Sequence, residues 1–219
     1  SKCKLKKAPG PDGFSAEIIV SAYKLNKDKM LSTFNLVLEN RIFPNNWKKT
    51  ELCLIEKKGD PNTKKYRPIC LVNILGIIAE RMIYNRLEKD LEAKGNLAEN
   101  QFGFRQGRST ADPLRIIRTK VEENLEKAYK NRDYILLITV DIKNAFNTLK
   151  WPLLIEELKK REISGYLIQL ICSYLSERKI VTKHGDEYEM NMGVPQGSIL
   201  GPLLWNIYFD PVARQPMPL

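Results

Sequence analysis

The feature that most constrains this chain is a short apolar run that ends on a carboxylate. Residues 134–141 read Tyr-Ile-Leu-Leu-Ile-Thr-Val-Asp. The run is too short for a helix, and its aromatic and β-branched residues favour a strand. It therefore predicts a buried strand with Asp141 at its end. Burying a carboxylate costs free energy unless something pairs with it, and a divalent cation is one such partner. The alternative is that Asp141 caps a helix or forms a turn.

Other segments show the periodicities of helices and strands. Helices are predicted in residues 15–40 on either side of Asn26, in residues 74–91 before Gly95, after Ser109 or Thr110 with an apolar face of Leu114, Ile117, Val121 and Leu125, after Pro152, and in residues 167–175 and 203–209. Strands are predicted at residues 50–56, before a turn at 57–61, and in a hairpin of residues 179–184 and 187–192. Because there is no regular βαβ rhythm, the predicted fold class is α+β with a largely antiparallel sheet.

The charge of the chain is unevenly placed. Residues 1–70 hold 15 Lys and Arg against 7 Asp and Glu, and the formal net charge of the 219 residues is +10. A basic third suggests a surface for a polyanion, and the alternative is a solvated, lysine-rich face. Lys57, Lys58, Lys64, Lys65 and Arg67 flank one predicted turn, where several cations could meet one phosphate chain.

Several classes of protein are disfavoured. The longest unbroken apolar run, residues 135–138, is far shorter than the roughly 20 residues of a membrane helix, so no membrane partner is expected. Without a visible signal peptide, an intracellular setting is favoured. The only histidine, His184, argues against a Ser-His hydrolase. The start, Ser1–Lys7, lacks an initiator methionine and is interpreted as a cut from inside a longer protein.

A second constraining segment is rich in glycine and proline. Residues 193–202, Gly-Val-Pro-Gln-Gly-Ser-Ile-Leu-Gly-Pro, hold three glycines and two prolines. Such a segment predicts a rigid turn whose backbone can approach a ligand closely. The alternative is a purely structural turn before a helix.

Five blocks in a fixed order resemble a known family. They are Ala8–Gly13, Tyr66–Ile69, Asn100–Thr110, Thr139–Phe146 and Gly193–Pro202. In this order they resemble the successive blocks of non-LTR (LINE-type) retrotransposon reverse transcriptases. Asn144–Asn147 and Leu203–Ile207 look most like arthropod elements that insert into ribosomal DNA.

The resemblance implies a fold and an activity. The fold would be the right-hand polymerase fold, with a fingers subdomain in residues 1–130 and a partial palm in residues 131–219. The activity would be that of an RNA-directed DNA polymerase, which extends a DNA 3′ end on an RNA template by two-metal nucleotidyl transfer during retrotransposition. The hairpin with two adjacent aspartates and the thumb are missing, since no Asp-Asp pair occurs in the chain. The chain alone is therefore expected to be inactive.

The resemblance also assigns roles to residues. Asp141 would be the catalytic carboxylate and would bind metal together with the Ile142 backbone carbonyl, in a site for two Mg²⁺ ions. Phe146 would exclude the 2′-hydroxyl of a ribonucleotide; the alternative is that it belongs to the core, as an aromatic residue after a buried strand usually does. Asp210, at the end of an apolar helix and before Pro211, is interpreted from its position as structural. The nucleotide would be bound by Lys57, Arg67, Asn144, Ala145, Phe146, Gln196 and Gly197. Template and primer would be bound by Gln101, Phe104, Arg105, Arg108 and Ser109.

Two other hypotheses stay open at this point. One is a stable, non-catalytic nucleic-acid-binding remnant. The other is a group II intron or telomerase-like reverse transcriptase. As a retrotransposon polymerase, the chain would have as partners template RNA, a DNA primer, dNTPs and the rest of a parent polyprotein. It would be nuclear when it acts on chromosomal DNA.

Overall fold

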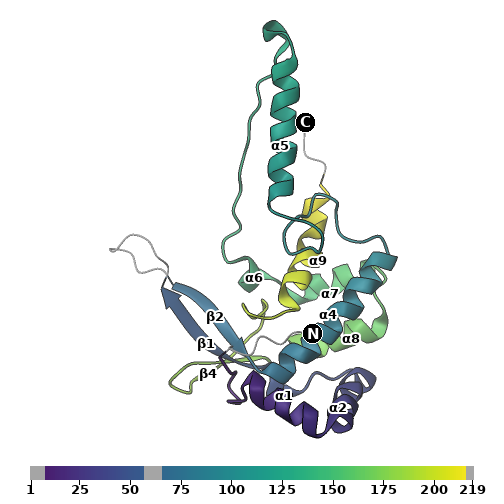
Figure 1. The fold of residues 1–219 in the computed structure, drawn as a ribbon, viewed down its shortest axis with the longest axis vertical. Helices are drawn as coiled ribbons and strands as arrows, with labels where there is room; N and C mark the ends of the chain where they lie inside the picture. The colour runs from purple at the N-terminus through teal and green to yellow at the C-terminus, as the bar shows by residue number, and fades with distance from the viewer. Residues whose placement is uncertain (1–7, 57–65, 216–219) are drawn as a thin grey trace.

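A computed structural model of the chain describes residues 8–56 and 66–215 (Figure 1). The helices are α1 (Ala16–Leu25), α2 (Lys27–Asn40), α3 (Asn45–Lys48), α4 (Ile74–Ala93), α5 (Ala111–Glu126), α6 (Ala145–Thr148), α7 (Trp151–Lys160), α8 (Gly165–Leu175) and α9 (Gly201–Ala213), with a 3₁₀ helix, η1 (Tyr129–Asn131). The strands are β1 (Lys49–Glu56), β2 (Tyr66–Val72), β3 (Lys179–Val181) and β4 (Glu187–Glu189).

The helices predicted from periodicity are confirmed. Asn26 ends α1 and caps α2, because its side chain accepts a hydrogen bond from the Lys29 N–H. Pro152 lies in the first turn of α7, where its missing N–H costs nothing. The C-terminal apolar helix, α9, begins two residues before the predicted segment and ends four residues after it.

The four strands form one mixed sheet in the order β2-β1-β3-β4. The pairs β1-β2 and β3-β4 are antiparallel, whereas β1 and β3 run parallel. The predicted largely antiparallel sheet and the hairpin of β3 and β4 are confirmed, although each hairpin strand is only three residues long. The turn predicted at residues 57–61 lies outside the described residues.

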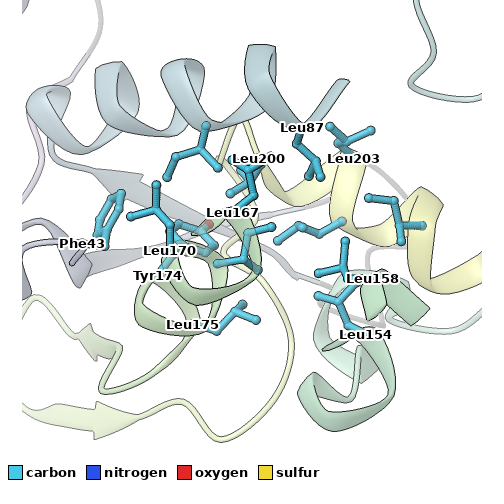
Figure 2. Packing of buried hydrophobic residues seen from close by; sticks show 14 of the residues in the cluster. Phe43, Leu87, Leu154, Leu158, Leu167, Leu170, Tyr174, Leu175, Leu200 and Leu203 are labelled. Carbon is cyan, nitrogen blue, oxygen red and sulfur yellow. The ribbon is translucent and has the colours of Figure 1, made fainter. Parts of the chain in front are cut away.

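The core lies between α4, α7, α8 and α9 (Figure 2). Leu87 of α4, Leu154 and Leu158 of α7, and Leu170 of α8 have no exposed surface. Each such side chain contributes roughly 2 kcal/mol by leaving water. This core fixes the start of α9 and the turn that precedes it, since Val194 and Leu200 are also fully buried in it.

The buried strand predicted at residues 134–141 is wrong. These residues have no regular secondary structure, and Leu136 and Val140 are 82% and 85% exposed. A strand persists only where a neighbouring strand takes its backbone groups and another layer covers its apolar side chains. No strand of the described sheet runs beside this segment. The segment instead returns from the tip of α5 to α6 (Figure 1).

Helix α5 is present where it was predicted, but its apolar face is not packed. None of its residues is buried, and Leu114 is 67% exposed. Figure 1 shows α5 projecting away from the other helices. Among the described helices, none combines the length and the apolar character needed to cross a bilayer.

Candidate functional site

A small hollow brings together residues from three distant parts of the chain. Tyr66, Arg67 and Pro68 come from β2, residues 144–147 come from the start of α6, and Gln196 comes from the turn before α9. Five of the predicted nucleotide-binding residues thus share one hollow: Arg67, Asn144, Ala145, Phe146 and Gln196. Lys57, also predicted for this set, lies outside the described residues.

The turn at residues 193–202 is the piece that joins these parts. On one side, the Gly193 N–H donates to the Leu149 carbonyl (2.7 Å) and the Val194 N–H donates to the Phe146 carbonyl (2.9 Å). On the other side, the Cys70 N–H of β2 donates to the Gln196 carbonyl (2.8 Å). Two backbone connections to the α6 region and one to β2 therefore set the width of the hollow.

Gly197, also predicted to bind nucleotide, is not among the residues that line the hollow. Its φ is +139°, and a Cβ atom added there would lie 2.4 Å from the Cys70 carbonyl oxygen. Real Cβ atoms essentially never come within 3.0 Å of such an atom. The turn can therefore approach β2 this closely only with glycine at position 197. Burial raises the pKa of the Cys70 thiol at this contact.

Asn144 forms the corner at which the exposed segment turns into α6. Its φ is +55°, a left-handed conformation that asparagine tolerates better than most residues. Its carbonyl accepts hydrogen bonds from the N–H groups of Asn147 and Thr148, at 2.9 and 3.2 Å. Side chains at Asn144 and Asn147 are exposed, so this corner offers polar groups to a ligand in the hollow.

Phe146 is half-buried, and its ring both contacts other aromatic side chains and forms part of the lining of the hollow. Its ring contacts Trp205 of α9 with centroids 6.2 Å apart, and Phe104 with centroids 5.8 Å apart. It also lines the hollow. The two roles considered for Phe146, a sugar gate and a core residue, are therefore compatible with one position, and the gate stays a prediction.

Asp141 is exposed and lies three residues before the hollow's edge at Asn144. In residues 8–56 and 66–215, no three His, Cys, Asp or Glu side chains gather in a way that could hold a metal ion. One carboxylate and the Ile142 carbonyl are too few ligands for two Mg²⁺ ions, which take most of their protein ligands from carboxylates. The described residues by themselves do not fit a two-metal site.

The predicted template-binding block is attached to α9 through a buried asparagine. The Gln101 side chain donates to Oδ1 of Asn206 (3.1 Å), and the Asn206 amide donates to the Gly103 carbonyl (2.9 Å). Arg105 donates to the Ala98 carbonyl (2.7 Å), and Ser109 accepts from the Ala111 N–H (3.3 Å). Gln101, Arg105 and Ser109 therefore hold the shape of their own block.

A second hollow lies between this block and α4. Phe104, Arg105 and Arg108 line it together with Tyr84, Glu88 and Glu92. Burial raises the pKa of Tyr84 to about 12, and the hydrogen bond and charge of Glu88 add to this effect. A phosphate placed there would meet carboxylates as well as arginines, and template binding by these residues stays a prediction.

Asp210 has the structural role that the sequence predicts. Its side chain is fully buried, accepts a hydrogen bond from the Ala98 N–H (2.6 Å), and pairs with Arg161 and Arg214. Burial opposes ionisation, but the Ala98 hydrogen bond and the two arginines together lower the pKa of Asp210 below its usual 3.8. Both of its carboxylate oxygens are occupied by these partners.

Two buried polar residues of the site region were missed by sequence reasoning. Glu80 of α4 and Asn206 of α9 have no exposed surface, and both bind the segments that form the hollows. The available signal was a polar side chain on the apolar face of a helix. The basic character of residues 1–70 is only partly visible, since 8 of its 15 cations lie in the undescribed ranges 1–7 and 57–65.

Comparisons with known proteins point to one family. The family model described as reverse transcriptase (RNA-dependent DNA polymerase) matches residues 55–218. A probable RNA-directed DNA polymerase from transposon BS of Drosophila melanogaster is 32% identical, over 93% of this chain and 23% of the relative. The Pol polyprotein of the type-1 retrotransposable element R1 of Bradysia coprophila is 31% identical, over 95% of this chain and 20% of the relative.

A chain in a solved partial Cas6-RT-Cas1–Cas2 complex is also similar, with 22% identity, a TM-score of 0.47, and coverage of 90% of this chain and 33% of that one. The 219 residues of this protein span about a fifth to a quarter of the length of the two retrotransposon relatives.

Proposed function

Since this chain belongs to the reverse transcriptase family, we propose that it forms the nucleotide-binding part of an RNA-directed DNA polymerase of a non-LTR retrotransposon. The observation that carries the proposal is the first hollow. Residues 67, 144–146 and 196 are far apart in the sequence, and the fold brings them to one place. These five residues belong to three different blocks of the family pattern.

The parts of the hollow have complementary roles in this proposal. Arg67 supplies a fixed positive charge for a triphosphate, because a guanidinium can bind phosphate oxygens in a bidentate manner. Exposed backbone and amide groups at Asn144 and Ala145 face the same ligand. The ring of Phe146 lies beneath the sugar, and Gln196 closes the opposite side. Gly197 sets the distance between Gln196 and β2.

The chain divides into fingers and palm in this proposal. Residues 1–130 form the fingers, and residues 131–219 form part of the palm. In the complete polymerase, Asp141 and the Ile142 carbonyl would be two of the ligands of a Mg²⁺ pair, which would need further carboxylates beyond those of the described residues. Bound Mg²⁺ would stabilise charge on the reacting phosphate. Gln101, Phe104, Arg105, Arg108 and Ser109 contact template RNA and DNA primer, and the polymerase acts in the nucleus.

A primer-extension assay tests the function. A full-length polymerase that contains this chain is incubated with a primed RNA template, dNTPs and Mg²⁺. We expect template-dependent synthesis, and we expect Asp141→Asn to abolish it without unfolding the protein. Asp133→Asn is the matched control, because Asp133 is exposed and lies at the start of the same segment. Its carboxylate pairs with Lys127, and its backbone groups, which the substitution leaves in place, bind the side chain of Asn124.

The same assay separates the polymerase from its main alternative. A non-catalytic remnant would bind the primed template without extending it, and Asp141→Asn would leave that binding unchanged. Full activity of folded Asp141→Asn would contradict the assignment of Asp141. Loss of activity in Asp133→Asn to the same degree would show that the segment, rather than the carboxylate, is what matters.

A further inference from the structure

Helix α4 carries a buried carboxylate whose hydrogen-bond donors all lie in the turn before α9. Oε2 of Glu80 accepts from Oγ of Ser198 (2.7 Å), from the Ile199 N–H (2.7 Å) and from the Leu200 N–H (3.3 Å). Two of these donors are the backbone N–H groups of the two residues that immediately precede α9. A residue more than 100 positions away in the sequence thus holds the segment that leads into α9.

The hydroxyl of Ser198 extends this cluster to α8. Its only proton goes to Glu80, so it accepts from the Tyr174 O–H (2.8 Å) and from the Gly201 N–H (2.9 Å). Tyr174 is fully buried, and its ring stacks against Arg178 at 4.5 Å. The back of the turn is therefore held by α4 and by α8 at the same time, in a place closed to solvent.

The front of the same turn faces the nucleotide hollow. Gln196, which lines the hollow, is two residues before Ser198. Gly197 between them rests against the Cys70 carbonyl. The turn is short, and Gly197, the one residue between Gln196 and Ser198, is held against the Cys70 carbonyl, so a displacement of Ser198 is transmitted to Gln196.

We propose that Glu80 is a positioning residue for the incoming nucleotide. It touches no substrate and acts by fixing the turn that carries Gln196. The inference rests on the proposed function of the hollow. Glu80 lies on α4, outside the hollow, and the affinity of the hollow for the nucleotide depends on it.

The acceptor oxygen, rather than the length of the side chain, is what this role requires. All three donors use Oε2, and Oε1 has no hydrogen-bond partner in the part of the chain that the structure describes. Glu80→Gln can place its carbonyl oxygen at the Oε2 position and its amide at the unpartnered one. Glu80→Met keeps a similar length and leaves the three donors without an acceptor.

The chain offers a matched control on the same helix. Asp90 of α4 accepts from the Ser164 N–H (2.7 Å) at the start of α8, just as Glu80 serves the start of α9. Neither Asp90 nor Ser164 lines the nucleotide hollow. Asp90→Leu therefore removes a comparable hydrogen bond at the start of α8, away from the turn that carries Gln196.

The experiment measures steady-state dNTP incorporation by the full-length polymerase that contains this chain. We expect Glu80→Met to raise KM for dNTP about tenfold, with kcat within about twofold of the wild type. A tenfold change equals about 1.4 kcal/mol, close to the net value of one or two hydrogen bonds. Glu80→Gln is expected to stay within about twofold of the wild type, as is the KM of Asp90→Leu.

The outcomes are separable. Absence of synthesis by the wild-type polymerase would remove the proposed function and this inference with it. An active wild type with an unchanged KM in folded Glu80→Met would overturn the inference alone, as would an equal rise in KM in Asp90→Leu. If Glu80→Met does not fold, Ser198→Ala decides. This small change keeps the carboxylate but removes the hydroxyl bridge, and it should raise KM about threefold. An unchanged KM in Ser198→Ala would then refute the role of Glu80.

Discussion

Replacing Gly197 by alanine tests whether the turn before α9 must lie directly against β2. The φ of +139° is nearly exclusive to glycine, and holding alanine there costs roughly 1–3 kcal/mol. The added Cβ would lie 2.4 Å from the Cys70 carbonyl oxygen, so the turn or β2 must also shift. That shift weakens the 2.8 Å hydrogen bond from Cys70 to Gln196, a further loss of about 1 kcal/mol. We expect a total destabilisation of about 3 kcal/mol.

Gly185→Ala provides the control for backbone strain alone. Gly185 has φ +89°, but an added Cβ there meets nothing within 4 Å. Its replacement should cost only the strain of a left-handed alanine, about 1 kcal/mol. The assay is urea unfolding of the purified chain followed by tryptophan fluorescence. Trp151 is a suitable probe because its indole N–H donates to the Gly193 carbonyl (2.8 Å) in the same turn. Equal losses in the two variants would refute the close-approach argument.

Further predictions concern the gate, the buried ion pair, nucleic-acid affinity and activity. In the full-length polymerase, Phe146→Val should raise ribonucleotide use relative to deoxyribonucleotide use, whereas equal losses with both substrates in a folded variant would leave Phe146 a core residue. The lowered pKa of Asp210 gives stability that is complete above pH 3.8 and is lost as pH falls through the lowered pKa. Asp210→Asn should therefore cost about 3 kcal/mol at neutral pH, and the free energy of unfolding of the variant should fall less steeply as the pH is lowered. An unchanged dependence of the free energy of unfolding on acid pH would contradict this. Binding to single-stranded RNA should weaken steeply between low and physiological salt, and salt-independent binding measured by fluorescence anisotropy would count against phosphate contacts. The 219-residue chain alone should not extend a primer on an RNA template, and template-dependent extension would contradict that expectation.

The sequence predicts helices well where the apolar face of the helix or a single residue near its end determines where the helix lies. Asn26 separates α1 from α2 as expected, and Pro152 lies in the first turn of α7. Residues 134–141 are the exception, because an apolar β-rich run indicates that a strand is possible but carries no information about its partner. The described sheet contains no strand beside that run. Local pattern therefore failed here because the outcome depends on a non-local neighbour.

The same distinction applies to the site. The grouping of Arg67, Asn144 and Gln196 followed from the family's order of blocks, and neither spacing nor composition could have predicted it. The contact that sets their separation is a backbone hydrogen bond from Cys70 to Gln196, and such a bond leaves no side-chain signature. Glu80 was missed because a glutamate in an amphipathic helix is normally assigned to the solvated face. Its burial depends on donors that come from the turn before α9.

Helix α9 connects the two predicted ligand surfaces through adjacent residues. Trp205 contacts the ring of Phe146 at the nucleotide hollow, and Asn206 binds Gln101 and the Gly103 carbonyl in the predicted template block. Phe104 of that block contacts Phe146 directly as well. A rigid helix held at its start by Glu80 and near its end by Asp210 cannot shift one surface without the other. The sugar of the incoming nucleotide and the template would thus be positioned against the same helix.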